Sequence, residues 1–381
     1  MSSWKKVLAL ALLSSSIASA DTIKKYPNYL EPLFSSINQT NIRLDRRMSR
    51  LPPGNSWDYD PLYDTKEVHF ASSWPHQLTA KTTLALTCDQ FEEREEQIRQ
   101  DNYLPESYFN IYFAGTLGFG DVYTRKNQTG FNYWTAGGLT GFDYFRSKGG
   151  FGLLLDYDRI KGHCSRHWGK FDIDEAHASL YMTYAPSHWA FKGIVGGGYE
   201  WYTIRRHIHD HHSAKGAPHG AEFDGFFGIE YAFENSQQNF QFVPIASAQY
   251  IHLNVEKYHE YNAGLSDTRV GSQIAKSLRS TLGARINGTI EGDRVVFTPE
   301  VLLAWQREYF DKTRHVHVKP RDFIGPKRSL KMGQPGRDIG LAGIDLLLTI
   351  DDTYGIEASY DFEWNHMYHD HNIYLCFNFT L

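Results

Sequence analysis

Histidine is the residue type in this chain with the clearest capacity for site chemistry. The sequence contains 18 histidines, and most of them are crowded into a few short polar stretches. Imidazole ligates zinc and copper and titrates near neutral pH, so a histidine cluster could bind a metal ion or sense pH. The best candidates for such a site are His207, His209, His211 and His212. A solvated polar loop is the simpler explanation of the same run.

A second chemical candidate is the stretch Gly162-His163-Cys164-Ser165-Arg166-His167, where a serine lies between two histidines. A nucleophilic serine needs a base within about 3 Å and a third group that orients the base. Residues this close together in an irregular loop rarely reach that geometry. The chain also contains neither a G-x-S-x-G nor an H-E-x-x-H motif. We therefore expect no enzymatic activity, no catalytic residue and no cofactor.

A third candidate is a basic stretch between residues 312 and 337, in which Asp322 is the only acidic residue. Its basic residues are Lys312, Arg314, Lys319, Arg321, Lys327, Arg328, Lys331 and Arg337. The stretch could contact anionic lipopolysaccharide or a host glycan, or fold inward and constrict a pore. An exposed basic loop is the alternative. The whole chain has a net charge of -5, so a nucleic-acid partner is not expected.

The first twenty residues have the pattern of a secretory signal peptide. Lys5 and Lys6 precede an apolar run over residues 7–13, and Ala18-Ser19-Ala20 forms a small-residue cleavage site. We expect export, followed by a polar N-terminal region over residues 21–105. Within that region, the charged sequence near 88–100 predicts a short helix. The remaining segment, 106–381, forms the second and larger part of the mature chain.

The elements that must position these candidates are strands. In the segment 354–364, Tyr, Ile, Ala, Tyr, Phe and Trp alternate with Gly, Glu, Ser, Asp and Glu. Strict alternation predicts a strand with one apolar and one polar face. Glutamate and arginine on the polar face cannot lie in a packed core without partners, so that face should meet water. The apolar face should then meet lipid.

The length and number of these segments predict a transmembrane barrel. The segments run for about ten residues or more, the length that a tilted strand needs to cross a bilayer. Open sheet edges are not tolerated in lipid, so the strands must close on themselves. We predict an all-β, twelve-stranded antiparallel transmembrane barrel. Its strands cover 109–123, 132–145, 150–161, 171–185, 188–204, 221–233, 240–256, 273–290, 294–310, 337–350, 353–365 and 372–381.

The connections support this prediction, because short turns alternate with mostly longer loops, as in outer-membrane barrels. Pro244 and a shift of phase after Tyr250 predict a bulge in the strand over 240–256. Aromatic residues near the strand ends predict girdles at the two membrane interfaces. These residues are Tyr144, Phe145, Trp201, Tyr202, Tyr309, Phe310 and Trp364.

Several phrases of the barrel segment resemble the autotransporter β-domain, the translocator barrel of type V secretion. They are AGGLTGFDYF (136–145), GGFGLLLDY (149–157), SLRSTLGARI (277–286), FTPEVLLAWQREYFD (297–311), GRDIGLAGIDLLL (336–348) and GIEASYDFEW (355–364). The resemblance implies a Gram-negative outer membrane and a pore helix where the charged segment near 88–100 lies. Two features of the N-terminal region depart from the family pattern. The region 21–105 is short for a passenger, and it has no Asn-Asn pair of the kind that self-cleaving members use.

The C-terminal sequence NIYLCFNFTL is apolar at every second residue up to the last. With Phe377, Phe379 and Leu381 it resembles the membrane-assembly signal that the barrel-assembly machinery reads, although family members usually end in Phe or Trp. The expected partners are this machinery, outer-membrane lipid, lipopolysaccharide, and a host or surface ligand at the outer loops.

Two hypotheses for the function follow. The first is a translocator-like barrel with little or no passenger that acts as a surface-exposed membrane protein. The second is a porin-like channel for small solutes, gated by the N-terminal segment.

Overall fold

The computed structural model describes Arg43, Arg47, Met48 and most of the chain from residue 107 onward. The described ranges are 107–124, 130–146, 149–165, 169–186, 188–207, 213–234, 240–262, 267–310, 315–320, 328–331, 336–351 and 353–381. The predicted signal peptide and the predicted helix near 88–100 lie outside these residues. No helix in the described ranges is long and apolar enough to cross a membrane.

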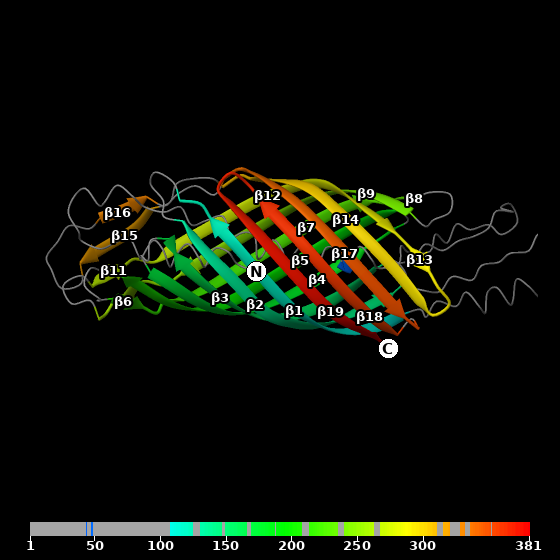
Figure 1. Cartoon of the computed structure of the whole chain (residues 1–381), viewed down its shortest axis with the longest axis horizontal. Coiled ribbons are helices and arrows are strands. Elements are labelled where there is room, and N and C mark those ends of the chain that lie inside the picture. The colour runs from blue at the N-terminus through cyan, green and yellow to red at the C-terminus, as the bar shows by residue number, and fades with distance from the viewer. Residues whose placement is uncertain are drawn as a thin grey trace, which may run out of the picture.

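Twelve long strands form a closed antiparallel barrel (Figure 1). They are β1 (Ser107–Val122), β2 (Phe131–Arg146), β3 (Gly149–Cys164), β4 (Gly169–Tyr184), β5 (Trp189–His207), β7 (His219–Tyr231), β9 (Phe240–Val255), β12 (Gln273–Gly288), β14 (Val295–Glu308), β17 (Asp338–Ile350), β18 (Tyr354–Trp364) and β19 (Tyr368–Thr380). The first strand pairs with the last, and β9 pairs with β12, so the wall has no open edge. The predicted fold class and all twelve predicted strands are confirmed.

The connections divide the barrel into two different ends. At one end, which we call the turn end, strands are joined by short segments such as 147–148 and 351–353. Two of these segments carry the small strands β8 (Phe233–Glu234) and β13 (Ile290–Glu291). Most connections at the opposite end, the loop end, are longer. Both Ser107 at the start of β1 and the C-terminal Leu381 lie at the turn end, because β1 and β19 are antiparallel neighbours.

The loop end carries a second sheet, which the sequence analysis treated as loops (Figure 1). Its four strands pair in the order β10 (Tyr258–His259), β11 (Thr268–Val270), β15 (His315–Pro320) and β16 (Arg328–Lys331). A further strand, β6 (Ser213–Gly216), pairs with β5. We call β10, β11, β15 and β16 the loop-end sheet. Strands this short carry too little alternation to be recognised before their partners are known.

The two faces of the barrel wall differ as the alternation predicts. On β19, Ile373, Leu375 and Phe377 are exposed on the outside, whereas Tyr374 and Cys376 between them are buried inside. Tyr144, Trp201, Tyr309, Phe310 and Trp364 are exposed, as the girdle prediction requires. It is wrong for Phe145 and Tyr202, which are buried and point inward. Adjacent strand residues face opposite sides, so Tyr144–Phe145 and Trp201–Tyr202 cannot both contribute two residues to the outside.

The predicted bulge at Pro244 is also wrong. The register of β9 against β12 runs without interruption from Val255 opposite Gln273 to Phe240 opposite Gly288. On its other side, β9 pairs with β7 up to Ile245 and with β8 from Phe242, in the same register. The pairing is therefore interrupted opposite Pro244 rather than shifted. A missing N–H donor removes a hydrogen bond from the ladder but does not require an extra residue.

The outward face offers a direct test of which side contacts lipid. Leu303 of β14 points outward and is 61% exposed. If this face lies in hydrocarbon, Leu303→Arg should lower the free energy of unfolding in lipid vesicles by about 2–4 kcal/mol. Ser272→Arg, at an exposed position just before β12 at the loop end, is the control, and it should change stability by less than about 0.5 kcal/mol. Equal stability of the two variants would contradict a lipid-facing Leu303.

Candidate functional site

The interior of the barrel at the loop end is filled by an apolar layer rather than by polar side chains. Inward-facing residues of the barrel wall form one continuous buried cluster with residues of the loop-end sheet. The wall contributes Val122, Phe131, Tyr133, Ile160, Cys164, Phe171, Ile173, Tyr202, Ile204, Ile251, Leu253, Val255, Ala275 and Tyr368, and the loop-end sheet contributes Tyr258, Val270, Val316 and Val318. The loop-end sheet thus packs onto the inner surface of the wall.

A buried ion pair joins the loop-end sheet to the wall next to this layer. Arg206 of β5 donates from Nε to Glu260 Oε1 at 3.1 Å and from Nη2 to Glu260 Oε2 at 2.5 Å. Thr268 of β11 also donates to Glu260 Oε2, at 2.5 Å. All three side chains are almost fully buried. The bidentate geometry of a guanidinium with a carboxylate makes this a well-defined anchor.

The interior also contains buried charged side chains at several depths. Arg279 of β12 lies 3.4 Å from Glu308 of β14 and 3.2 Å from Glu363 of β18, so it links three strands. Glu230 of β7 forms ion pairs with both Lys192 of β5 and Arg285 of β12. The polar face predicted from the sequence is therefore confirmed. Many of its charged side chains, however, form buried ion pairs and are not exposed to water.

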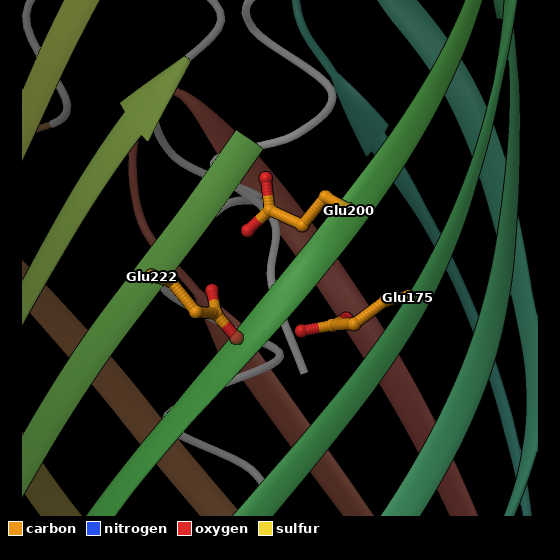
Figure 2. Close-up of side chains that lie close together, drawn as sticks. All are labelled: Glu175, Glu200 and Glu222. Atoms are coloured by element: carbon orange, nitrogen blue, oxygen red, sulfur yellow. The ribbon is translucent and has the colours of Figure 1, made fainter. Parts of the chain in front are cut away.

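Three glutamates from neighbouring strands converge in the barrel interior (Figure 2). Glu175 of β4 lies directly opposite Glu200 of β5, and Glu222 comes from β7. One carboxylate oxygen from each lies within 4.8 Å of the others, and all three residues are buried. Tyr202 donates a hydrogen bond to Glu200. Oxygen-only ligand sets suit hard cations such as calcium or magnesium, so among the described residues this trio could hold such an ion.

A histidine that the sequence analysis did not single out lies in the same region. His177 Nε2 is 2.8 Å from Asp224 Oδ1, and Nδ1 is 3.4 Å from Asp156 Oδ2. Ser179 Oγ lies 3.4 Å from Nδ1. Because both ring nitrogens face carboxylates, the arrangement suits an imidazole that donates from both nitrogens. Neither nitrogen is then placed to take a proton from Ser179.

At the turn end, residues that precede the barrel in the chain lie inside it. Arg47 donates from Nε to Asp143 Oδ2 at 2.7 Å and from Nη1 to Asn378 Oδ1 at 2.6 Å. Its guanidinium also lies over the ring of Tyr112, 3.8 Å from the centroid. Arg43 lies over Tyr374 in the same way, and Met48 belongs to an apolar cluster with inward-facing wall residues. Arg43, Arg47 and Met48 have helical backbone.

The predicted pore helix near 88–100 lies outside the described residues. The role of Arg43, Arg47 and Met48 was missed because nothing in their local sequence marks them. The partners of Arg47, including the buried Asp143 on β2, lie far away in the sequence.

The predicted histidine site is only partly described. His207 is exposed at the end of β5, and His209, His211 and His212 lie outside the described residues, so the metal site stays a prediction. His369 and His371 have aromatic surroundings instead. His371 stacks on Phe119 with a centroid separation of 4.8 Å and accepts or donates a hydrogen bond with Tyr360. His369 pairs in the same way with Tyr123. These two histidines belong to the outward aromatic belt.

The remaining sequence candidates are separated from the interior. His163 is exposed on β3, whereas Ser165 follows the strand and its backbone N–H donates to Gly130 O. His167 lies outside the described residues. Within the basic stretch, Lys319 lies on the exposed face of β15. The C-terminal Phe377, Phe379 and Leu381 are all exposed on the outside of the barrel.

Comparison with solved structures finds the same fold. The translocator domain of the autotransporter NalP from Neisseria meningitidis aligns with a TM-score of 0.59 and 11% identity, over 76% of this chain and 95% of that domain. The β-domain of the Bordetella autotransporter BrkA aligns with a TM-score of 0.53 and 12% identity, over 71% and 98%. The transport unit of AIDA-I from Escherichia coli gives 0.51 and 13%, over 73% and 91%. No curated protein matches by sequence.

A family model agrees with these likenesses. The model for the autotransporter β-domain matches residues 111–361, which is more than half of the chain. The match spans the wall from β1 to β18, and the structure closes that wall with β19. Barrels of this family lie in the bacterial outer membrane. This chain belongs to the autotransporter β-domain family.

Proposed function

We propose that this chain is a surface-exposed outer-membrane protein built on a translocator-type barrel that is closed in its resting state. The loop-end sheet closes the barrel on the outside, and Arg43, Arg47 and Met48 close it at the periplasmic turn end. The proposed role is display of the loop-end sheet at the cell surface, with no catalytic step.

The observation that supports this proposal best is the apolar layer at the loop end. A constriction lined by apolar side chains opposes the passage of ions, because these side chains provide no polar groups to replace the hydration shell of an ion. Val270, Val316 and Val318 of the loop-end sheet are each at most 5% exposed within that layer. The contacts of Arg47 with Asp143 and Asn378 support a second closure at the other end.

The alternative is a porin-like channel that small solutes cross. The charged side chains of the interior, such as Arg279, Glu308 and Glu363, favour this alternative because such side chains line hydrophilic pores. The two functions differ in whether the resting protein conducts ions.

The proposal predicts that the purified full chain gives no steady conductance in planar lipid bilayers. Two deletions probe the two closures: removal of residues 21–100, and replacement of residues 312–335 by a short Gly-Ser linker. Each deletion alone should leave conductance low, since one closure remains. The combined deletion should give a large, stable conductance because both closures are gone.

Each protein is first checked for heat-modifiable migration, which reports a folded barrel. A high conductance of the undeleted chain would contradict the proposal and favour the porin-like alternative. A folded double-deletion barrel that stays closed would also contradict it, because the two proposed closures would then not be what blocks the pore.

A further inference from the structure

The exposed face of the loop-end sheet is a compact array of basic side chains. His259, Arg269, His317 and Lys319 are all exposed, and the residues between them along the strands are buried. The register places Arg269 of β11 opposite His259 of β10 on one side and opposite Lys319 of β15 on the other. His317 lies two residues from Lys319 on the same face, opposite Ser329 of β16. We call His259, Arg269, His317 and Lys319 the basic face.

The basic face is held on a firm support. Its opposite side contributes Tyr258, Val270, Val316 and Val318 to the apolar layer inside the barrel. The buried pair of Arg206 with Glu260 fixes the same sheet to the wall. Side chains on such a sheet keep a constant spacing, with neighbouring strands about 4.8 Å apart. A ligand can therefore meet both Arg269 and Lys319 at once without ordering a flexible loop.

The charge on this face is one-sided. The four strands contain no aspartate or glutamate, although the chain as a whole has a net charge of -5. Like charges directly opposite each other on neighbouring strands destabilise a sheet, and Arg269 and Lys319 form such a pair. An anion lying between the two side chains would offset this repulsion. A polyanionic ligand would therefore reduce the repulsion between Arg269 and Lys319.

We propose that the basic face binds an anionic polysaccharide outside the cell. The position of the sheet favours a polysaccharide over the phosphates of membrane lipid. The sheet extends beyond the ends of the barrel strands, at the end of the molecule opposite the C-terminus (Figure 1). Lipid phosphates lie close to the edge of the outward apolar band, whereas a polymer can reach past it. The inference depends on the proposed function only in placing the loop end outside.

The test measures binding of heparin, a sulfated polysaccharide, to the full chain folded in detergent. Arg269→Gln combined with Lys319→Gln should weaken heparin binding at least about tenfold. The slope of log affinity against log salt concentration should become shallower by about 1.5. Binding then forms two fewer charge contacts and releases fewer counterions from the polysaccharide. The variant Arg269→Lys combined with Lys319→Arg keeps both charges and should retain most of the affinity.

The matched control is Arg146→Gln combined with Arg294→Gln. Both arginines are exposed at the turn end, so this variant loses the same charge from the opposite end of the barrel. It should bind heparin within about twofold of the parent chain if the basic face is the binding site. An equal loss in the control and the basic-face variant would show general charge attraction and overturn the proposal.

A second arm uses vesicles that contain phosphatidylglycerol, whose only anionic group is the lipid phosphate. If the basic-face substitutions weaken binding to these vesicles and leave heparin binding unchanged, the commitment to a polysaccharide is wrong and a lipid headgroup is the ligand. No change with either probe overturns the proposal altogether. Because binding is measured in detergent, a failure here is distinguishable from a failure of the closed-barrel proposal, which is read from conductance.

Discussion

A chain that lacks Phe377–Leu381 should be exported but should not insert into the outer membrane. These residues supply the turn-end part of β19, where Phe377 pairs with Phe113 and Phe379 pairs with Ile111. On its other side, Phe379 pairs with Tyr354 of β18. The deletion therefore leaves edges on both β1 and β18, and unpaired backbone groups cost several kcal/mol each in lipid. The same deletion removes the proposed signal for the barrel-assembly machinery.

Heat-modifiable migration and fractionation of the outer membrane measure the outcome. The control replaces Phe377 and Phe379 by leucine, which keeps the strand length, the register and the apolar outer face. This control should insert. If the truncated chain became heat-modifiable and membrane-embedded to the same extent as the control, the role assigned to the C-terminal residues would be wrong.

Arg206→Met should release the loop-end sheet from the barrel while leaving the wall folded. The substitution removes the bidentate partner of Glu260, which is 1% exposed. Removing one partner of a buried ion pair costs about 3–5 kcal/mol, because the other charge, here that of Glu260, stays buried without compensation. If opening of the sheet is fast compared with cleavage, this raises the open population about 100- to 4000-fold. Proteolysis of the connections 256–272 and 309–337 should accelerate accordingly.

The double variant Arg206→Met with Glu260→Met separates the charge effect from loss of packing. Replacing a buried ion pair by apolar residues of similar volume is often neutral, so the double variant should regain most of the protease resistance. A double variant as sensitive as Arg206→Met would show that the packing of the sheet depends on the specific contacts of Glu260, including that with Thr268. Unchanged cleavage of Arg206→Met would contradict the anchoring role.

The strands of the wall could be read from the sequence because their environment is simple. Lipid on one side and polar groups on the other produce alternation over many residues, and alternation is a local property. The same rule explains the errors. Phe145 and Tyr202 were assigned to the girdle by residue type, whereas their position in the alternation puts them inside. Pro244 predicts a bulge in β9. The structure instead shows an interruption in the neighbouring strand, between β7 and β8, with no change of register.

The sequence alone determined the barrel, the number of its strands and the outward face of the strands that alternate regularly. The tertiary structure decided what fills the barrel, because that depends on register and on contacts between distant residues. Glu175, Glu200 and Glu222 meet only when three strands are aligned. Arg47 finds Asp143, and Arg206 finds Glu260, across 96 and 54 residues of sequence. The loop-end sheet and its basic face exist only because segments from two separate connections pair with each other. Long-range pairing of this kind leaves no periodic trace in the chain.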